Sequence, residues 1–283
     1  MSYEITLLTT MAISILFALS LNFISGFCGQ ISLGHAAFLG TGAYVSALMT
    51  KASVPFLLTL PVAALAAATL GFVIGLTSLR VRHDFLAITT MGAGFLFVGI
   101  VRQQDFLGGE VGISGIPGTG FSRIGFMVFC MALAAAFMAF SLYVRKSWMG
   151  FVFQSVADNE DVARVLGIDA SRYKLIAFVI GTATAGIAGA LYAHHFRYIG
   201  PDSFGFVESV SVLAMVIVGG IGSVWGVALA AAMLSIMPLL FQFIDDYKLL
   251  AYSALLFLMM RFAPDGIAGL FTRAFTRRRS TEV

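Results

Sequence analysis

The chain has 283 residues, of which 59% are hydrophobic and only 11% are charged, and its mean hydropathy is +0.96. Soluble domains carry about 25% charged residues, so this composition is too poor in charge to cover a surface that faces water. It excludes a soluble enzyme, a nucleic-acid-binding protein and a disordered chain.

Long uncharged stretches account for about two thirds of the chain. They lie at 5–50, 52–79, 85–101, 124–144, 175–196, 209–244 and 249–260. A helix that crosses a bilayer needs about 20 mostly apolar residues. The first spans are predicted at 5–25, 33–50, 54–79, 85–101, 124–144 and 175–196. The sequence therefore predicts an all-α, polytopic transmembrane bundle that forms one domain over residues 1–283.

The Lys and Arg residues predict how the bundle is oriented. With the N-terminus outside, 12 basic residues fall on the inner side: Arg80, Arg82, Arg145, Lys146, Arg164, Arg172, Lys174, Arg261, Arg273, Arg277, Arg278 and Arg279. Four fall on the outer side: Lys51, Arg102, Arg123 and Arg197. Because cytoplasmic loops are enriched in Lys and Arg, we expect an inner loop at about 147–173 and a basic cytoplasmic tail at about 262–283.

This orientation requires the stretch at 209–244 to cross the membrane twice or to dip and return. Its centre, 219–226, reads GGIGSVWG, and such a glycine cluster breaks a straight helix. We expect two short helical segments around the break, and eight or nine glycine-broken spans in total.

Several kinds of catalytic and energy-coupling site are absent from the sequence. It contains no G-x-x-x-x-G-K-[ST], H-E-x-x-H or G-x-S-x-G motif, and no Asp or Glu in the middle of an apolar stretch. A stand-alone secondary carrier needs an ion-binding site in the membrane, and a membrane enzyme needs clustered reactive groups. We therefore expect a transporter subunit without an ATPase site of its own, with no cofactor or metal, driven by a partner.

Cys28 and Cys130 are predicted to be buried apolar residues, and His194 and His195 to be interfacial.

The inner loop contains a predicted amphipathic helix at 155–168. Asp158 or Asn159 can cap it, acidic residues follow at its positive end, and a glycine ends it. Val162, Val165 and Leu166 share one face, which suits the groove of a partner protein; the alternative is a loop helix that packs on its own chain. The residues of this candidate site are Asp158, Asn159, Glu160, Asp161, Val162, Arg164, Val165, Leu166 and Gly167.

Two uncharged, glycine-interrupted segments, 22–44 and 219–226, are candidates for a translocation pathway. Irregular backbone at membrane depth is tolerated only inside protein or beside a water-filled cavity, and paired interruptions mark transport routes. The alternative is close helix packing through small residues, which we expect for Gly71-x-x-x-Gly75. The candidate pathway residues are Gln30, Ser32, Gly34, His35, Gly219, Gly220, Gly222 and Ser223.

The outer loop at 105–118 is interpreted as an ordered cap, a docking surface or a linker.

Motifs along nearly the whole chain resemble one transporter family. They are GQISLGHAAF at 29–38 with GAY at 42–44, GGEVGISGIP at 108–117, NE at 159–160 with LGI at 166–168, KLIAF at 174–178, VGGIGS at 218–223 and PDGIAGL at 264–270. In these motifs the chain resembles LivM-type permease subunits of bacterial branched-chain amino acid ABC importers.

The resemblance implies partners and a role for each candidate site. The partners are a second, LivH-type permease, two cytoplasmic ATPase subunits that bind ATP and Mg, and a periplasmic substrate-binding protein, all at the bacterial inner membrane. The helix at 155–168 is then the coupling helix to an ATPase. Members of the family also carry urea, amides or aromatic acids, so these substrates are alternatives to branched-chain amino acids.

Overall fold

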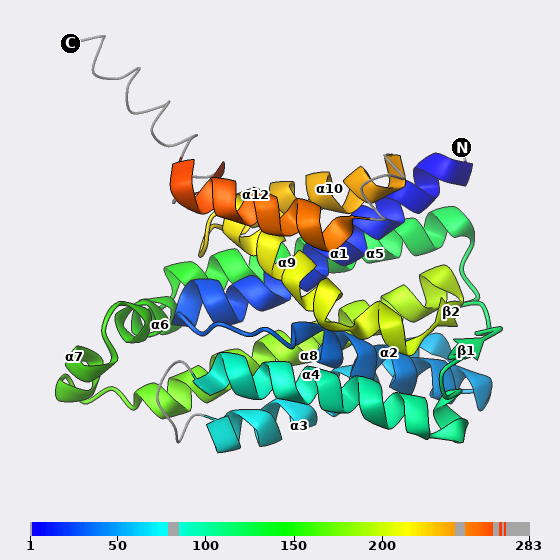
Figure 1. Ribbon diagram of the computed structural model, residues 1–283, viewed down its shortest axis with the longest axis horizontal. Coiled ribbons are helices and arrows are strands. Elements are labelled where there is room, and N and C mark those ends of the chain that lie inside the picture. Colours follow the sequence, from blue (N-terminus) through cyan, green and yellow to red (C-terminus); the bar gives the residue numbers. More distant parts are fainter. Residues whose placement is uncertain (1, 79–84, 241–246, 263–265, 268, 270–283) are drawn as a thin grey trace, which may run out of the picture.

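The computed structural model describes residues 2–78, 85–240, 247–262, 266, 267 and 269. These residues form an elongated bundle of α-helices (Figure 1). The helices are α1 (Ser2–Cys28), α2 (His35–Lys51), α3 (Phe56–Ser78), α4 (Phe85–Gln103), α5 (Arg123–Lys146), α6 (Trp148–Asp158), α7 (Glu160–Val165), α8 (Ala170–Phe196), α9 (Phe206–Gly219), α10 (Val224–Leu240) and α12 (Lys248–Phe262). Two short 3₁₀ helices, η1 (Asp105–Leu107) and η2 (Pro201–Phe204), and two strands, β1 (Ile113–Ser114) and β2 (Tyr198–Ile199), complete it.

Six helical segments within the described residues are long and apolar enough to cross a membrane. They are Tyr3–Cys28, Phe56–Thr77, Phe85–Gln103, Arg123–Lys146, Ala170–Phe196 and Pro201–Gly219. Shorter apolar helices occupy Val224–Pro238 and Leu249–Phe262, and α2 has 17 residues. The all-α membrane bundle expected from the sequence is thus confirmed, while the count of eight or nine spans stays a prediction.

The two ends of the bundle carry different elements, and the basic residues are divided between them. The N-terminus, β1 and β2 lie at one end, and α6 and α7 lie at the other (Figure 1). We call these the N-terminal end and the α7 end. Arg145 and Lys146 finish α5 at the α7 end. Arg102 and Arg123 lie at the opposite end, on the last turn of α4 and the first of α5. These predicted inner and outer basic residues therefore lie at opposite ends of the bundle.

Helix α8 lies at the centre of the bundle and packs against α1, α2 and α3. Small residues let the backbones touch: a Cβ on Gly189 would lie 1.9 Å from the Leu39 carbonyl oxygen, and one on Gly42 would lie 2.1 Å from that of Gly186. A Cβ on Gly71 would lie 2.2 Å from the hydroxyl of Thr182, so Gly71 has the packing role expected for it.

Helix α2 begins inside the bundle rather than at its surface. After α1 ends, residues 29–34 run without helical structure from the α7 end into the bundle, and α2 starts near the middle of its length (Figure 1). His35, the first residue of α2, is completely buried. Helix α9 also begins near the middle, where the Ser209 hydroxyl accepts a hydrogen bond from the Ala36 amide at 3.1 Å.

This arrangement corrects one expectation. The sequence showed no carboxylate in the middle of an apolar stretch because the uncharged run begins at Ser209, one residue after Glu208. The structure places Glu208 in the first turn of α9, inside the candidate span Pro201–Gly219. Glu208 is therefore an acidic residue on an apolar helix that begins near the middle of the length of the bundle (Figure 1).

The outer loop is ordered at the N-terminal end. β1 pairs with β2 in antiparallel register, Ile113 opposite Ile199, and the Tyr198 hydroxyl donates a hydrogen bond to the Val111 carbonyl at 3.0 Å. Ile113 and Ile116 are buried. The loop is therefore ordered rather than a simple linker, and its role as a docking surface stays a prediction. The predicted basic positions Arg80 and Arg82, and most of the predicted tail at 262–283, lie outside the described residues.

Candidate functional site

The helix predicted at 155–168 is two helices that meet at Asn159. Residues 155–158 belong to α6, and α7 covers only Glu160–Val165. Of the two candidate caps, Asn159 has this role: its Oδ1 accepts hydrogen bonds from the amides of Asp161 at 3.0 Å and Val162 at 3.1 Å. The prediction of one continuous helix was wrong because Asn159 has an extended backbone and its side chain replaces the helical bonds. Gly167, with φ of +84°, follows the end of α7 as expected.

Helix α7 presents an apolar face at the surface of the bundle. The residues predicted to share this face are strongly exposed: Val162 by 55%, Val165 by 88% and Leu166 by 71%. On the other side of α7, Ala163 is buried. Three neighbouring apolar side chains exposed on a short surface helix are typical of a site that another protein covers.

A buried ion pair holds α7 against the start of α8. The Lys174 ammonium contacts Oε2 of Glu160, and the two side chains are only 7% and 9% exposed. Arg164 binds the other oxygen, Oε1, from the solvent side at 2.6 Å. The sequence indicates Lys174 only as an inner basic residue and as the first residue of the KLIAF motif, because nothing in the sequence pairs it with a carboxylate 14 positions earlier.

The segment at 29–34 and the first residue of α2, His35, hold four of the predicted pathway residues in the protein interior. Gln30, Ser32 and His35 are buried, and Gln30 donates a hydrogen bond from Nε2 to the Lys174 carbonyl at 2.9 Å. Gly34 packs on α4 so closely that a Cβ there would lie 1.7 Å from the Thr90 carbonyl oxygen. The glycine is thus needed for backbone contact.

Three polar atoms of residues 30–35 have no hydrogen-bond partner among the described residues: Gln30 Oε1, Ser32 Oγ and His35 Nδ1. The His35 ring can be assigned a tautomer. The Ser20 hydroxyl donates its one proton to the Phe17 carbonyl at 2.6 Å, so it accepts from His35 Nε2 at 2.8 Å. His35 Nδ1 therefore carries a lone pair. These buried polar atoms need partners from water or from another conformation of the segment.

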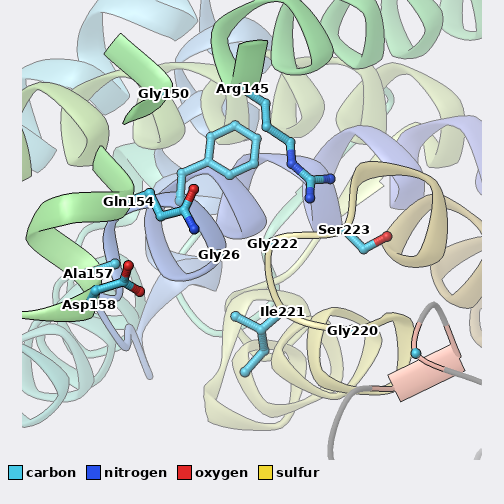
Figure 2. A pocket seen from close by; sticks show the side chains of 12 residues that line it. Gly26, Arg145, Gly150, Gln154, Ala157, Asp158, Gly220, Ile221, Gly222 and Ser223 are labelled. Carbon is cyan, nitrogen blue, oxygen red and sulfur yellow. The ribbon is translucent and has the colours of Figure 1, made fainter. Parts of the chain in front are cut away.

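The loop at 220–223, which separates α9 from α10, lines a pocket at the α7 end of the bundle. The pocket has a volume of about 440 Å³ and lies between the loop at 220–223, the end of α1, and α6. Figure 2 shows Arg145 and Gln154 pointing toward the space beside this loop. Asp158, the last residue of α6, lines the pocket as well. Gly220 and Gly222 have φ of +99° and +80°, conformations that favour glycine.

The structure places the two groups of predicted pathway residues in different surroundings. Gly220, Gly222 and Ser223 line the pocket, whereas Gln30, Ser32, Gly34 and His35 do not. Gly219 packs on α10, where a Cβ would lie 2.4 Å from Val227 Cα. The segments 22–44 and 219–226 do meet at Gly222: its amide donates a hydrogen bond to Asn22 Oδ1 at 2.9 Å, and a Cβ on Gly26 would lie 2.5 Å from its nitrogen. Both breaks thus border α1.

The adjacent histidines have separate partners. His194 is buried against the Phe56 ring at a centroid distance of 4.6 Å and bonds the Ala190 carbonyl, whereas His195 Nε2 lies 3.2 Å from the Thr10 hydroxyl. Both lie in the last turn of α8, His194 buried inside the protein, and their position at the membrane interface stays a prediction. Within the described ranges no group of three or more His, Cys, Asp or Glu side chains could hold a metal ion.

Comparisons with known proteins agree with the motifs. The profile of the family described as branched-chain amino acid transport system / permease component matches residues 4–263. The high-affinity branched-chain amino acid transport system permease protein LivM of Escherichia coli K12 is 34% identical, over 92% of this chain and 68% of the relative. The corresponding protein BraD of Pseudomonas aeruginosa is 26% identical, over 90% of this chain and 91% of the relative.

A second type of permease matches part of the chain. LivH of Escherichia coli K12 is 32% identical, over 47% of this chain and 44% of the relative. No solved structure shows a significant match. The relatives are named as transport permeases rather than enzymes. Since the family profile and the LivM match each cover most of the sequence, this multi-pass membrane protein belongs to the family of branched-chain amino acid transport permeases.

Proposed function

We propose that this chain is a membrane-spanning permease subunit of an ATP-driven importer and passes branched-chain amino acids into the bacterial cytoplasm. Its membership of the permease family carries the proposal. Its partners are a LivH-type permease, two ATPase subunits that bind ATP and Mg, and a periplasmic binding protein. The chain itself needs no cofactor and hydrolyses no ATP. The relatives named LivM and LivH support a paired permease.

Helix α7 is the contact with an ATPase subunit. The exposed apolar face of Val162, Val165 and Leu166 and its position at the bundle end rich in Arg and Lys support this role. The α7 end is then cytoplasmic and the N-terminus lies outside, which agrees with the expected bias of basic residues. In this orientation the chain crosses the membrane eight or nine times, with the pair α9 and α10 broken at 220–223.

Transport follows alternating access around the two non-helical segments, 29–34 and 220–223. ATP binding closes the ATPases, α7 passes the movement to the bundle, and a passage opens from outside to inside. The residues at 30–35 and 219–223 border it, because irregular backbone at membrane depth needs protein or water beside it. An amino acid zwitterion with an apolar side chain suits a passage that is only weakly polar.

The substrate is tested by uptake into cells that carry the complete importer. We expect labelled leucine to enter in an ATP-dependent manner, and unlabelled isoleucine and valine to compete with it. Competition by urea, a short amide or an aromatic acid, but not by isoleucine or valine, would replace the substrate and keep the class of transporter. Uptake by the purified chain alone in vesicles would contradict the proposal and indicate a secondary carrier.

The contact with an ATPase is tested with one substitution at each end of the bundle. Val165→Asp places a charge on the α7 face, and Val111→Asp places it on the outer cap at a residue that is 78% exposed. Because both positions face solvent, both variants should fold. We expect only Val165→Asp to lose the ATPase subunits when the tagged chain is purified. Equal recovery of the ATPases with both variants would contradict the role of α7.

A further inference from the structure

Lys174 contacts both helix α7 and the non-helical segment at 29–34. Its side chain pairs with Glu160 on α7, and its main-chain carbonyl accepts the hydrogen bond from Gln30 Nε2 at 2.9 Å. We propose that Lys174 is the positioning residue that transmits movement of α7 to the broken segment at 29–34. This inference rests on the proposed function, in which α7 receives the movement of an ATPase.

The ion pair is suited to transmit movement because it is buried. With both side chains less than a tenth exposed, separating them would leave a charge in a poorly solvated place, which is strongly unfavourable. Glu160 therefore cannot shift far without Lys174. The exposed Arg164, by contrast, binds the same carboxylate from the solvent side, where such contacts are weak.

A second contact connects the α6–α7 region with the segment at 29–34. Gly29 has φ of +68°, and a Cβ there would lie 3.2 Å from Cα and Cβ of Ala157, near the end of α6. The backbone of the broken segment thus lies directly against the helix that precedes α7. Movement of the α6–α7 junction reaches residues 29 and 30 from two sides, through packing at Ala157 and through the hydrogen bond to Lys174.

The broken segment has a reason to adopt a second conformation. Gln30 Oε1, Ser32 Oγ and His35 Nδ1 are buried without partners in the part of the chain that the structure describes. A displacement that gives these acceptors water or protein donors recovers the cost of burying them. A small movement of α7 then changes the relative populations of two conformations of the segment. Helix α2 begins at the end of this segment, so its first turn would move too.

The test uses Gln30→Met and Lys174→Met in the complete importer, purified through a tag on this chain and placed in proteoliposomes. Gln30→Met removes the bond to Lys174 together with the unpartnered Oε1, so it should change stability little. Lys174→Met removes the charge but keeps a long side chain. Arg102→Met is the matched control, since it breaks the exposed pair with Asp202 at the N-terminal end.

We expect both test variants to keep ATP hydrolysis but to move about ten-fold less leucine per ATP, a usual size for coupling between sites. The double variant should lower this ratio no further than either single one, because independent effects on passage and coupling would instead add. Lys174→Arg, which retains the cation, should restore part of the ratio, and Arg102→Met should leave it unchanged. An unchanged ratio in Gln30→Met would overturn the inference, as would a parallel fall in hydrolysis and transport caused by loss of assembled complex. If the unsubstituted complex shows no ATP-driven transport, the proposed function fails instead.

Discussion

At the scale of single residues, Gly34 shows how little space the broken segment leaves. A Cβ at this position would lie 1.7 Å from the Thr90 carbonyl oxygen, a backbone atom that cannot rotate away. We expect Gly34→Ala to destabilise the protein by roughly 3 kcal/mol, at the upper end of the usual cost of overpacking. Thermal unfolding in detergent measures the effect.

Gly92 and Gly99, on the same helix as Thr90, provide the control. A Cβ at either position would meet nothing within 4 Å among the described residues. Alanine there should be tolerated or slightly stabilising, because it favours the helix. If Gly34→Ala unfolded at the same temperature as Gly99→Ala, the close approach of 29–34 to α4 would be wrong.

Glu208 is the residue whose importance the structure reveals most directly. A carboxylate within a membrane span costs about 2.5–3.5 kcal/mol on insertion scales and usually has a function. We expect Glu208→Gln to fold at least as stably but to lower leucine uptake about ten-fold, which equals roughly 1.4 kcal/mol of lost interaction. Unchanged uptake at equal expression would exclude a role for the charge.

At the scale of elements, α7 depends on its cap. A helix of six residues is too short to be stable alone, and the Asn159 side chain satisfies two of its free amides. We expect Asn159→Ala to cost about 1 kcal/mol and to speed hydrogen exchange at 160–166. Asn159→Asp keeps the acceptor and should retain protection. Faster exchange throughout α8 as well would show that the effect is not local to α7.

The helices could be predicted from the sequence because lipid leaves the backbone few choices. Uncharged runs of suitable length became α1, α3, α4, α5 and α8, and the glycines at 219–222 lie where α9 ends. The depth at which α2 and α9 begin could not be predicted, because contacts between distant residues, such as Ala36 with Ser209, determine it. Asn159 was predicted as a candidate cap of α7, but the separate helix α6 that ends at Asp158 was not, because residues 147–158 were expected to belong to a loop.

At the scale of the whole molecule, the α7 end contains most of what the candidate site needs. The pocket at 220–223, the ion pair of Glu160 with Lys174 and the exposed face of α7 all lie there, and the broken segment leads from this end to the middle of the bundle. The pathway residues were predicted as one group because they share composition. Their separation into a pocket and a closed interior depends on how α1 lies between them, which local sequence does not encode.

The orientation of the whole bundle is the last prediction. Val111→Cys and Val165→Cys place single thiols at opposite ends, at positions that are 78% and 88% exposed. The native Cys28 and Cys130 are buried and should not react. With the N-terminus outside, a membrane-impermeant maleimide should label Val111→Cys in cells whose outer membrane alone is permeable. It should label Val165→Cys only after the inner membrane is opened. The reverse pattern would place α7 outside, away from any ATPase, and contradict the proposed coupling.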